Sequence, residues 1–120
     1  MTLEELGRRA VACKHWRWMD GMLIQPLNSR TAVIEEEYIH DRGWSAKRRK
    51  WDDLHPDLSD PATIGCLLAL VREAWGQDDM SAFRYKSRWC VEHTPEGSRC
   101  SAFYGETEAE ALVSALKAAP

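Results

Sequence analysis

The stretch of this chain that most constrains its fold is LSDPATIGCLLALVREAWG, residues 58–76. Asp60 and Pro61 mark a helix start, because an N-cap aspartate accepts an otherwise unpaired backbone N–H and a proline at the first helical position has its φ preset. Gly76 can adopt the left-handed conformation that ends many helices. Between these ends only Arg72 and Glu73 carry charge. The segment therefore predicts a helix covered by other elements, with a structural role and not a functional motif.

Two further helices are expected near the ends of the sequence. Thr2 and Glu5 make a T-x-x-E capping box, and apolar residues recur at helical spacing over residues 3–14. Thr107 and Glu110 make the same box at the start of EAEALVSALKAA. Both segments are expected to pack one apolar face against the rest of the fold.

Between the helices the sequence favours two antiparallel hairpins. The β-prone runs MLIQPL and TAVIEEEY are separated by the turn-compatible residues 28–30. The segment SAFRYKSRWCVEH alternates apolar and polar residues as one half-buried strand over residues 81–93, and TPEGSR then turns the chain back. Counting outward from a loop at residues 95–97 sets Trp89 opposite Phe103.

This order of elements, α-β-β-α-β-β-α, predicts an α+β fold with one four-stranded antiparallel sheet packed with helices. A chain of 120 residues with 44% hydrophobic and 29% charged residues is typical of one ordinary domain. We therefore expect a single domain over residues 1–120. Residues 39–60 show no clean period and are expected to form a long irregular loop, and loops of this size inside compact domains are often functional.

The charge and the cysteine content limit which cell compartment and which class of partner are expected. The formal net charge of −3 lacks the overall basic excess that marks many nucleic-acid binders, so any basic patch must be local. No apolar run approaches the roughly 18 residues that suggest a membrane span, and the N-terminal residues carry charges where a signal peptide needs an apolar run. We expect a cytoplasmic protein without a membrane partner. Its four cysteines are expected to be free thiols.

Two basic groups are the candidate ligand- or partner-binding residues. One lies in the predicted loop, where cations stand beside tryptophans and could neutralise phosphates and stack on bases. The other is a stripe on one face of the predicted strand over residues 81–93, which spans roughly 13 Å and could follow phosphates or an acidic surface. The alternatives are a solvated loop and an ordinary polar strand face. The candidates are Arg42, Trp44, Lys47, Arg48, Arg49, Lys50, Trp51, Arg84, Lys86 and Arg88.

No catalytic residue is predicted. The histidines His15, His40, His55 and His93 have no serine or cysteine nucleophile in a recognisable context, and the sequence holds no glycine-rich phosphate loop. Cys90 and His93 lie three residues apart on one predicted strand, so their side chains should point to opposite faces and cannot share a metal ion. Neither a metal nor another cofactor is expected.

Three blocks of the sequence together resemble a known family. RRAVACKHWRWMDGMLIQP, DLSDPATIGCLLALVREAWG and GETEAEALVSALKAA, in this order, are similar to the phage ABA sandwich domain, a group of small phage and prophage proteins of largely unassigned function. Residues 30–54 are the least matched part. The resemblance implies an α/β/α layered sandwich and supplies no catalytic motif.

The resemblance implies a non-enzymatic phage or prophage accessory protein that binds a host component in an infected or lysogenic bacterial cell. Small phage proteins of this kind often act in counter-defence, by inhibiting a nucleic-acid-guided defence effector or by sequestering a signalling nucleotide. The expected partner is therefore a host protein or a nucleotide or nucleic-acid ligand. A nucleic-acid-binding regulator is the alternative, and a small hydrolase or nuclease comes third. An edge strand and exposed aromatic residues would permit a homo-oligomer.

Overall fold

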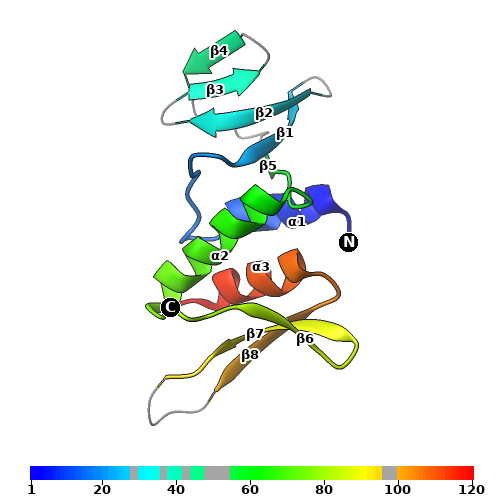
Figure 1. Cartoon of the computed structure of the whole chain (residues 1–120), viewed down its shortest axis with the longest axis vertical. Coiled ribbons are helices and arrows are strands. Elements are labelled where there is room, and N and C mark those ends of the chain that lie inside the picture. The colour runs from blue at the N-terminus through cyan, green and yellow to red at the C-terminus, as the bar shows by residue number, and fades with distance from the viewer. Residues whose placement is uncertain (28–29, 36–37, 42–43, 48–54, 96–99) are drawn as a thin grey trace.

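The computed structural model describes residues 1–27, 30–35, 38–41, 44–47, 55–95 and 100–120, and the side chains of residues 1–24, 55–95 and 100–120. Within these residues the chain forms three helices and two antiparallel sheets (Figure 1). The helices are α1 (Leu3–Val11), α2 (Pro61–Trp75) and α3 (Glu108–Ala118). The first sheet has the order β4-β3-β2-β1-β5 and the second has the order β6-β7-β8. The strands are β1 (Leu23–Leu27), β2 (Arg30–Glu35), β3 (Tyr38–Asp41), β4 (Trp44–Lys47), β5 (His55–Pro56), β6 (Ala82–Tyr85), β7 (Arg88–His93) and β8 (Ser101–Gly105).

Helix α2 begins and ends where its capping residues predict. The Asp60 carboxylate accepts hydrogen bonds from the backbone N–H of Thr63 at 3.0 Å and from its hydroxyl at 2.8 Å. Pro61 is the first helical residue, and Gly76 ends the helix with a φ of 66°. The Thr63 hydroxyl also accepts a hydrogen bond from the backbone N–H of Leu23 at 2.9 Å, so the start of α2 is tied to β1.

The other two helices start at the predicted capping threonines. Thr2 and Glu5 form the reciprocal capping box, with distances of 3.1 and 3.3 Å, and α1 ends at Val11, earlier than the predicted residue 14. Thr107 accepts a hydrogen bond from the backbone N–H of Glu110 at 3.2 Å. The Glu110 carboxylate accepts its hydrogen bond from the N–H of Glu106 at 2.7 Å, one residue before the cap. None of the helices in the described part of the chain is long and apolar enough to cross a membrane.

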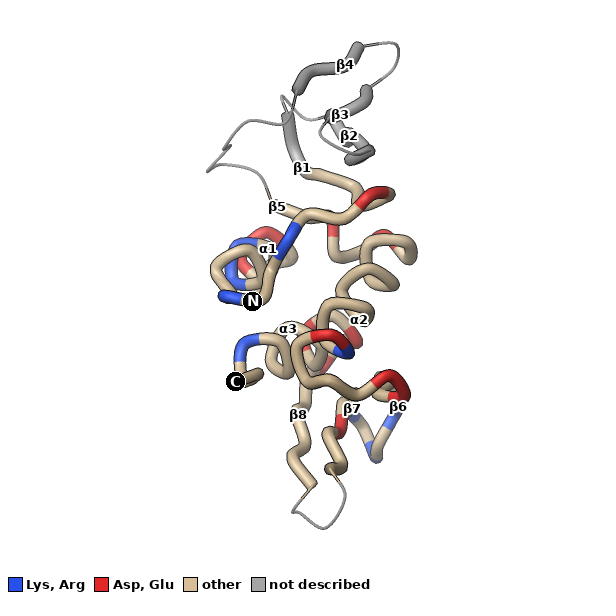
Figure 2. The backbone as a smooth tube through the Cα atoms, turned by 90° about the vertical axis from the view of Figure 1, so that its left-hand side faces the viewer, with Lys and Arg blue, Asp and Glu red and all other residues tan. Residues whose placement is uncertain are grey.

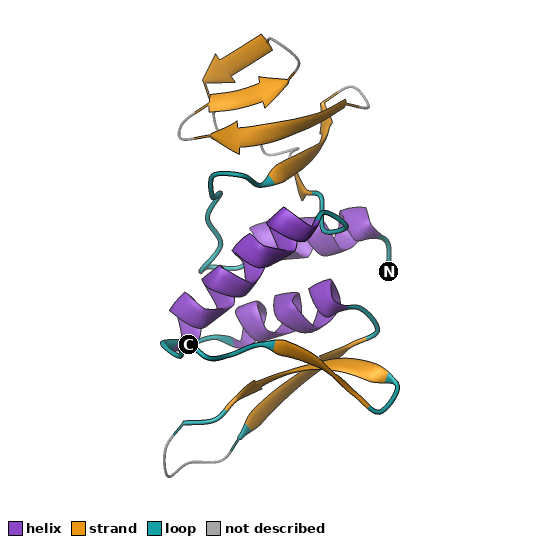
Figure 3. Cartoon of the chain, in the orientation of Figure 1, coloured by secondary structure: helices purple, strands orange, loops and turns teal. Residues whose placement is uncertain are grey.

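Helix α3 lies at the centre of the described packing. It contacts β7 and β8 on one side and α1 and α2 on the other, so the layers run sheet, α1 with α2, α3, sheet along the 50 Å length of the molecule (Figure 3). The largest fully buried side chains come from α2, α3 and the segments beside them. They include Met22, Ile24, Leu67, Leu70, Met80, Leu112 and Leu116.

The prediction of one four-stranded sheet is wrong, although the α+β class is confirmed. The first hairpin, β1 with β2, is paired on its outer sides by β5 and β3, so both of its edges are already occupied within its own sheet. Strands β6, β7 and β8 form a separate sheet beyond α3 (Figure 1). Because the helices lie between the two sheets, the expected α/β/α order of layers is replaced by a sheet at each end.

The prediction of an irregular loop over residues 39–60 is wrong wherever the chain forms strands. β3 and β4 pair with each other, with Ile39 opposite Ala46, and β5 pairs with β1. These strands have four residues or fewer. An alternating pattern cannot be recognised over so short a run, which explains why the sequence did not indicate them. Residues 42–43 and 48–54 lie outside the described residues.

The first sheet meets the helices at a close contact between α1 and β5. A Cβ placed on Gly7 would lie 3.1 Å from the Cβ of His55 and 3.1 Å from the carbonyl oxygen of Pro56. Glycine at this position of α1 therefore lets β5 approach the helix. His55 is 4% exposed, and its Nδ1 has no hydrogen-bond partner among the described residues.

Two glycines in different surroundings make a matched pair for a stability test. We expect Gly65→Ala to raise the free energy of unfolding by about 0.5–1 kcal/mol, because the residue lies inside α2 with no atom within 4 Å of an added Cβ. Gly105→Ala should lower it by about 1–3 kcal/mol, since its Cβ would lie 2.5 Å from the Cβ of Glu110 and 2.6 Å from the backbone nitrogen of Ala111. Urea denaturation measures both values. A stabilising Gly105→Ala would contradict the close approach of β8 to α3.

His55 should make the stability of the fold depend on pH. Burial lowers the pKa of His55 below its usual value; the positive charge of Arg8 acts in the same direction, while Glu4 and Asp57 oppose it. The unfolded chain, in which the pKa is about 6.5, then binds more protons than the folded chain. We expect the free energy of unfolding to be highest above this pH and to fall as the pH drops toward the lowered pKa of the folded state. Urea denaturation at a series of pH values measures how steeply the free energy of unfolding changes with pH. This dependence should be shallower in His55→Gln. Equal dependence in the two proteins would contradict the role given to His55.

Candidate functional site

The sheet formed by β6, β7 and β8 has one covered face and one open face. On the covered face Val91 is completely buried, and Trp89 and Phe103 pack against the core. The three helices lie on this side (Figure 1), and none of the described helices covers the opposite face. We call this opposite side the open face.

The predicted single strand over residues 81–93 is a hairpin with a two-residue turn at Lys86 and Ser87. Tyr85 pairs with Arg88, and Arg84 pairs with Trp89. Lys86 adopts a φ of 57°, in the left-handed region that L side chains seldom adopt. Neither turn residue is a glycine or an asparagine, the residues that normally mark such turns.

The turn divides the predicted basic stripe. On a continuous strand Arg84 and Arg88 would share a face, but across this turn the faces exchange. Arg84 lies on the side of Trp89, whereas Arg88 lies on the open face with Tyr85, and Lys86 occupies the turn between them. Figure 2 shows these cations gathered at the tip of the hairpin. The prediction that the three form one stripe is therefore wrong.

The predicted pairing of Trp89 with Phe103 is also wrong, but the predicted face is right. Phe103 lies opposite Val91, and Trp89 lies opposite Gly105. The difference is a shift of two residues, and a shift of two leaves every side chain on its original face. Both aromatic rings therefore face the core as expected.

The open face carries aromatic side chains around a buried cysteine. Phe83, Cys90 and Tyr104 are cross-strand neighbours, and Tyr85 lies beside them on the same face. Tyr85 is 46% exposed and Tyr104 is 40% exposed, whereas Cys90 is 1% exposed although it lies outside the core cluster. The neighbouring side chains therefore cover the thiol. Burial raises the pKa of Cys90, and the nearby Glu92 and Cys100 add to the effect.

Cations lie over exposed rings on this face and at its turn. The guanidinium of Arg88 lies 4.3 Å from the centroid of the Tyr104 ring, and the ammonium of Lys86 lies 5.5 Å from that of Tyr85. Arg88 makes no ion pair with any described carboxylate. A guanidinium over an exposed ring supplies a positive charge and a planar group that can stack. The arrangement suits a ligand that is both anionic and aromatic.

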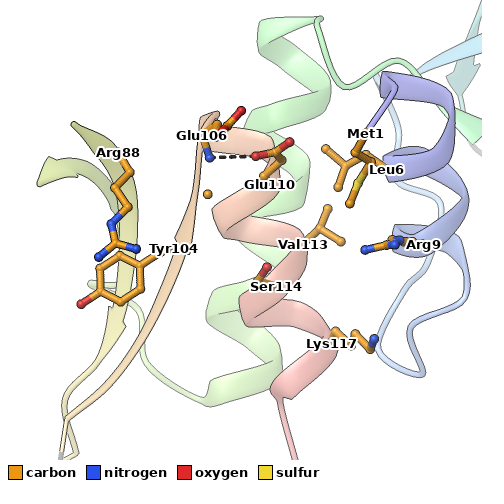
Figure 4. Close-up of a pocket in the computed structure, with 11 residues that line it drawn as sticks. Met1, Leu6, Arg9, Arg88, Tyr104, Glu106, Glu110, Val113, Ser114 and Lys117 are labelled. Atoms are coloured by element: carbon orange, nitrogen blue, oxygen red, sulfur yellow. Dashed lines mark hydrogen bonds between the residues drawn. The ribbon is translucent and has the colours of Figure 1, made fainter.

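A groove of about 620 Å³ adjoins Arg88 and Tyr104, with α1 and α3 on its other sides (Figure 4). Its charged residues are separated. Glu106 and Glu110 lie near the start of α3, whereas Lys117 lies in its last turn and Arg9 extends from α1. Val113 and Leu6 contribute apolar side chains between them. We call this hollow the β8 groove.

The remaining predicted site residues lie outside the described side chains. Trp44 and Lys47 are the first and last residues of β4. Arg42 and residues 48–51 lie outside the described residues. Their role in ligand binding stays a prediction.

Sequence reasoning missed Tyr85 and Tyr104 as candidate binding residues. For Tyr104 a signal was available, because neighbouring residues of a strand face opposite sides. If Phe103 faces the core, Tyr104 of the same strand must face outward. No such signal existed for Tyr85, because an uninterrupted strand would have placed its side chain on the same face as that of Trp89.

The described histidine and cysteine side chains are spread over different parts of the fold. Within them, no group of three or more His, Cys, Asp or Glu residues could hold a metal ion. Cys90 lies on the open face, and His93 stacks on Trp75 on the covered side with ring centroids 4.5 Å apart. The opposite orientation of these two side chains is as the sequence predicts. All four cysteines are free thiols.

No family model matches this sequence, and no curated protein or solved structure matches it either. The resemblance to the phage ABA sandwich domain therefore stays a prediction.

The cover over Cys90 can be tested with a thiol reagent. Near neutral pH we expect the exposed Cys100 to be alkylated well before Cys90, because burial both blocks access to Cys90 and raises its pKa. Tyr104→Ala should increase the rate at Cys90 severalfold, whereas Tyr85→Ala, which is not its direct cross-strand neighbour, should change it less. Peptide mass spectrometry over a time course measures the extent of alkylation at each cysteine. Equal effects of the two substitutions would contradict the expectation that Tyr104 contributes more than Tyr85 to the burial of Cys90.

Proposed function

We propose that this protein is a non-enzymatic phage or prophage accessory protein that binds a host component in the cytoplasm of the bacterial host. The part of that component which it recognises is a nucleotide or a single-stranded nucleic acid. The phage setting and the counter-defence role rest on the resemblance of the three sequence blocks. The class of ligand rests on one observation, the Arg88 guanidinium 4.3 Å from the exposed ring of Tyr104 on the open face.

The chemistry of the open face supports this class of ligand. Aromatic rings on an open sheet face can stack bases, which contributes about 1–3 kcal/mol per base. Tyr85 and Tyr104 leave much of their rings exposed. Arg88 can stack on a base or neutralise a phosphate, and it has no described carboxylate to compete for it.

Both forms of the counter-defence hypothesis use the same surface. A protein that sequesters a signalling nucleotide would hold a small ligand on the rings. A protein that inhibits a nucleic-acid-guided effector would bind the guide or the displaced strand. A nucleic-acid-binding regulator is the alternative. Arg48 and Arg49 lie outside the described residues, so their part in binding is a separate prediction.

Removing the stacking ring should weaken binding of a labelled single-stranded oligonucleotide. We expect Tyr104→Ala to raise the dissociation constant about 5- to 150-fold, the equivalent of one lost stacking contact. Arg88→Gln should also weaken binding and should reduce the slope of log K against log salt by about 0.7, as expected for one lost phosphate contact with a single strand. Fluorescence anisotropy at several salt concentrations measures both effects. The same proteins are then tested with a panel of cyclic and linear nucleotides.

Arg84→Gln is the matched control, because Arg84 lies on the other face of the same hairpin. It should leave binding close to that of the parent protein. A parent protein that binds no oligonucleotide or nucleotide at low salt would contradict the proposed ligand class. Equal losses in Arg84→Gln and Arg88→Gln would show that overall charge, and not the open face, controls binding. Reversing the charges of Arg48 and Arg49 tests the loop prediction with the same ligand.

A further inference from the structure

Strand β8 has an edge that lacks the usual protection. It is the last strand of the second sheet, and no other described strand pairs with its outer side. Its five residues, SAFYG, include no charge and no proline. Proteins usually protect such edges with lysine, proline or a bulge, because the unpaired backbone groups can pair with another strand. The opposite edge strand, β6, carries Arg84.

The β8 groove runs beside this edge, with two glutamates toward one end and Lys117 and Arg9 toward the other; Arg88 also lines the end that holds Glu106. Glu106 follows directly after Gly105, so the acidic end of the groove adjoins the end of β8. Helix α3 then runs back along the sheet, and Lys117 lies seven residues beyond Glu110, a rise of about 10 Å. Arg9 and Lys117 make no ion pair with described carboxylates. In Figure 4 the two glutamates lie at one end of α3 and Lys117 at the other, with Arg9 extending from α1 toward the groove.

We propose that a second copy of this chain pairs antiparallel with the edge of β8. In a two-fold dimer of this kind the Gly105 end of one strand lies beside the Ser101 end of the other. The end of each β8 groove that holds the glutamates then faces the end of the partner's groove that holds Lys117. Because the dimer is two-fold symmetric, this pairing of opposite charges is made twice. A parallel pairing of the strands would bring like charges together. Self-complementary charge beside an unprotected edge is therefore the reason to choose a second copy as the occupant.

Figure 2 shows β8 and α1 on the same side of the molecule, with α2 and β6 on the opposite side, so α1 and the β8 groove of each copy lie on the side of the proposed pairing. A two-fold axis perpendicular to the sheet keeps the helices of both copies on one side of the joined sheet. The two open faces become continuous, and Tyr104, which lies on the pairing strand, contributes one ring from each copy near the axis. The use of this enlarged face for ligand binding rests on the proposed function, whereas the dimer does not.

The test is the oligomeric state of the full chain in the absence of nucleic acid. Sedimentation velocity over a wide concentration range should show a monomer–dimer equilibrium. Lys117→Glu and Glu106→Lys should each raise the dimer dissociation constant about tenfold or more, because each places like charges across the interface twice. The double variant should recover dimerisation, since both charge pairs form again with exchanged signs. A parent protein that is monomeric throughout would overturn the proposal, and so would a double variant no better than the single ones.

Two further variants separate the interface from general effects of charge. Glu108→Lys reverses a charge in the first turn of α3 but lies outside the β8 groove, so dimerisation should persist. Ala102→Lys places a lysine on the pairing strand and should give a monomer whose circular dichroism spectrum matches that of the parent. A dimer that withstands Ala102→Lys would show that another surface pairs. If the protein dimerises but binds no nucleotide or nucleic acid, the proposed function fails and this inference stands.

Discussion

The indole of Trp75 joins the layers on which the rest of this structure depends. Its N–H donates a hydrogen bond of 2.8 Å to the backbone carbonyl of Ala115 in α3. Its ring lies 4.5 Å from that of His93 and 5.5 Å from that of Phe103, measured between centroids. One side chain at the end of α2 therefore holds α3 and the covered face of the second sheet together. The contact holds the helices on this one face of the sheet, and no described helix covers the opposite face.

The helices could be predicted from the sequence because their ends are encoded by residues with local and specific roles. Asp60 and Pro61 start α2, Gly76 ends it, and Thr2 with Glu5 starts α1, all without help from distant parts of the chain. The division into two sheets could not be predicted in this way. It depends on which strand edges meet, and β5, a strand of two residues, occupies the edge of β1. No periodic pattern can reveal a strand so short.

The candidate site was predicted in part, and its error has one cause. Arg88 was selected as a binding residue, but as a member of a stripe with Arg84 and Lys86 that does not exist. Two turn residues at Lys86 and Ser87 exchange the faces while leaving the alternation of the sequence intact. The turn residue with positive φ is Lys86, at 57°, and lysine is not a residue type from which such a turn is predicted. The same exchange moves Tyr85 from the core side to the open face, where it completes the candidate surface.

The contact between Gly7 and His55 has a consequence for cooperativity. It joins the first sheet to α1 at one end of the molecule, whereas Trp75 joins α2, α3 and the second sheet at the other end. The hydrogen bond from Leu23 to Thr63 is a second link between the first sheet and the helices. Structural units joined by few contacts can open separately, with free energies below that of global unfolding. Protonation of the buried ring at His55 acts at the first contact and leaves the second intact. Acid should therefore loosen the end of the molecule that carries the first sheet while the open face and the β8 edge keep their shape.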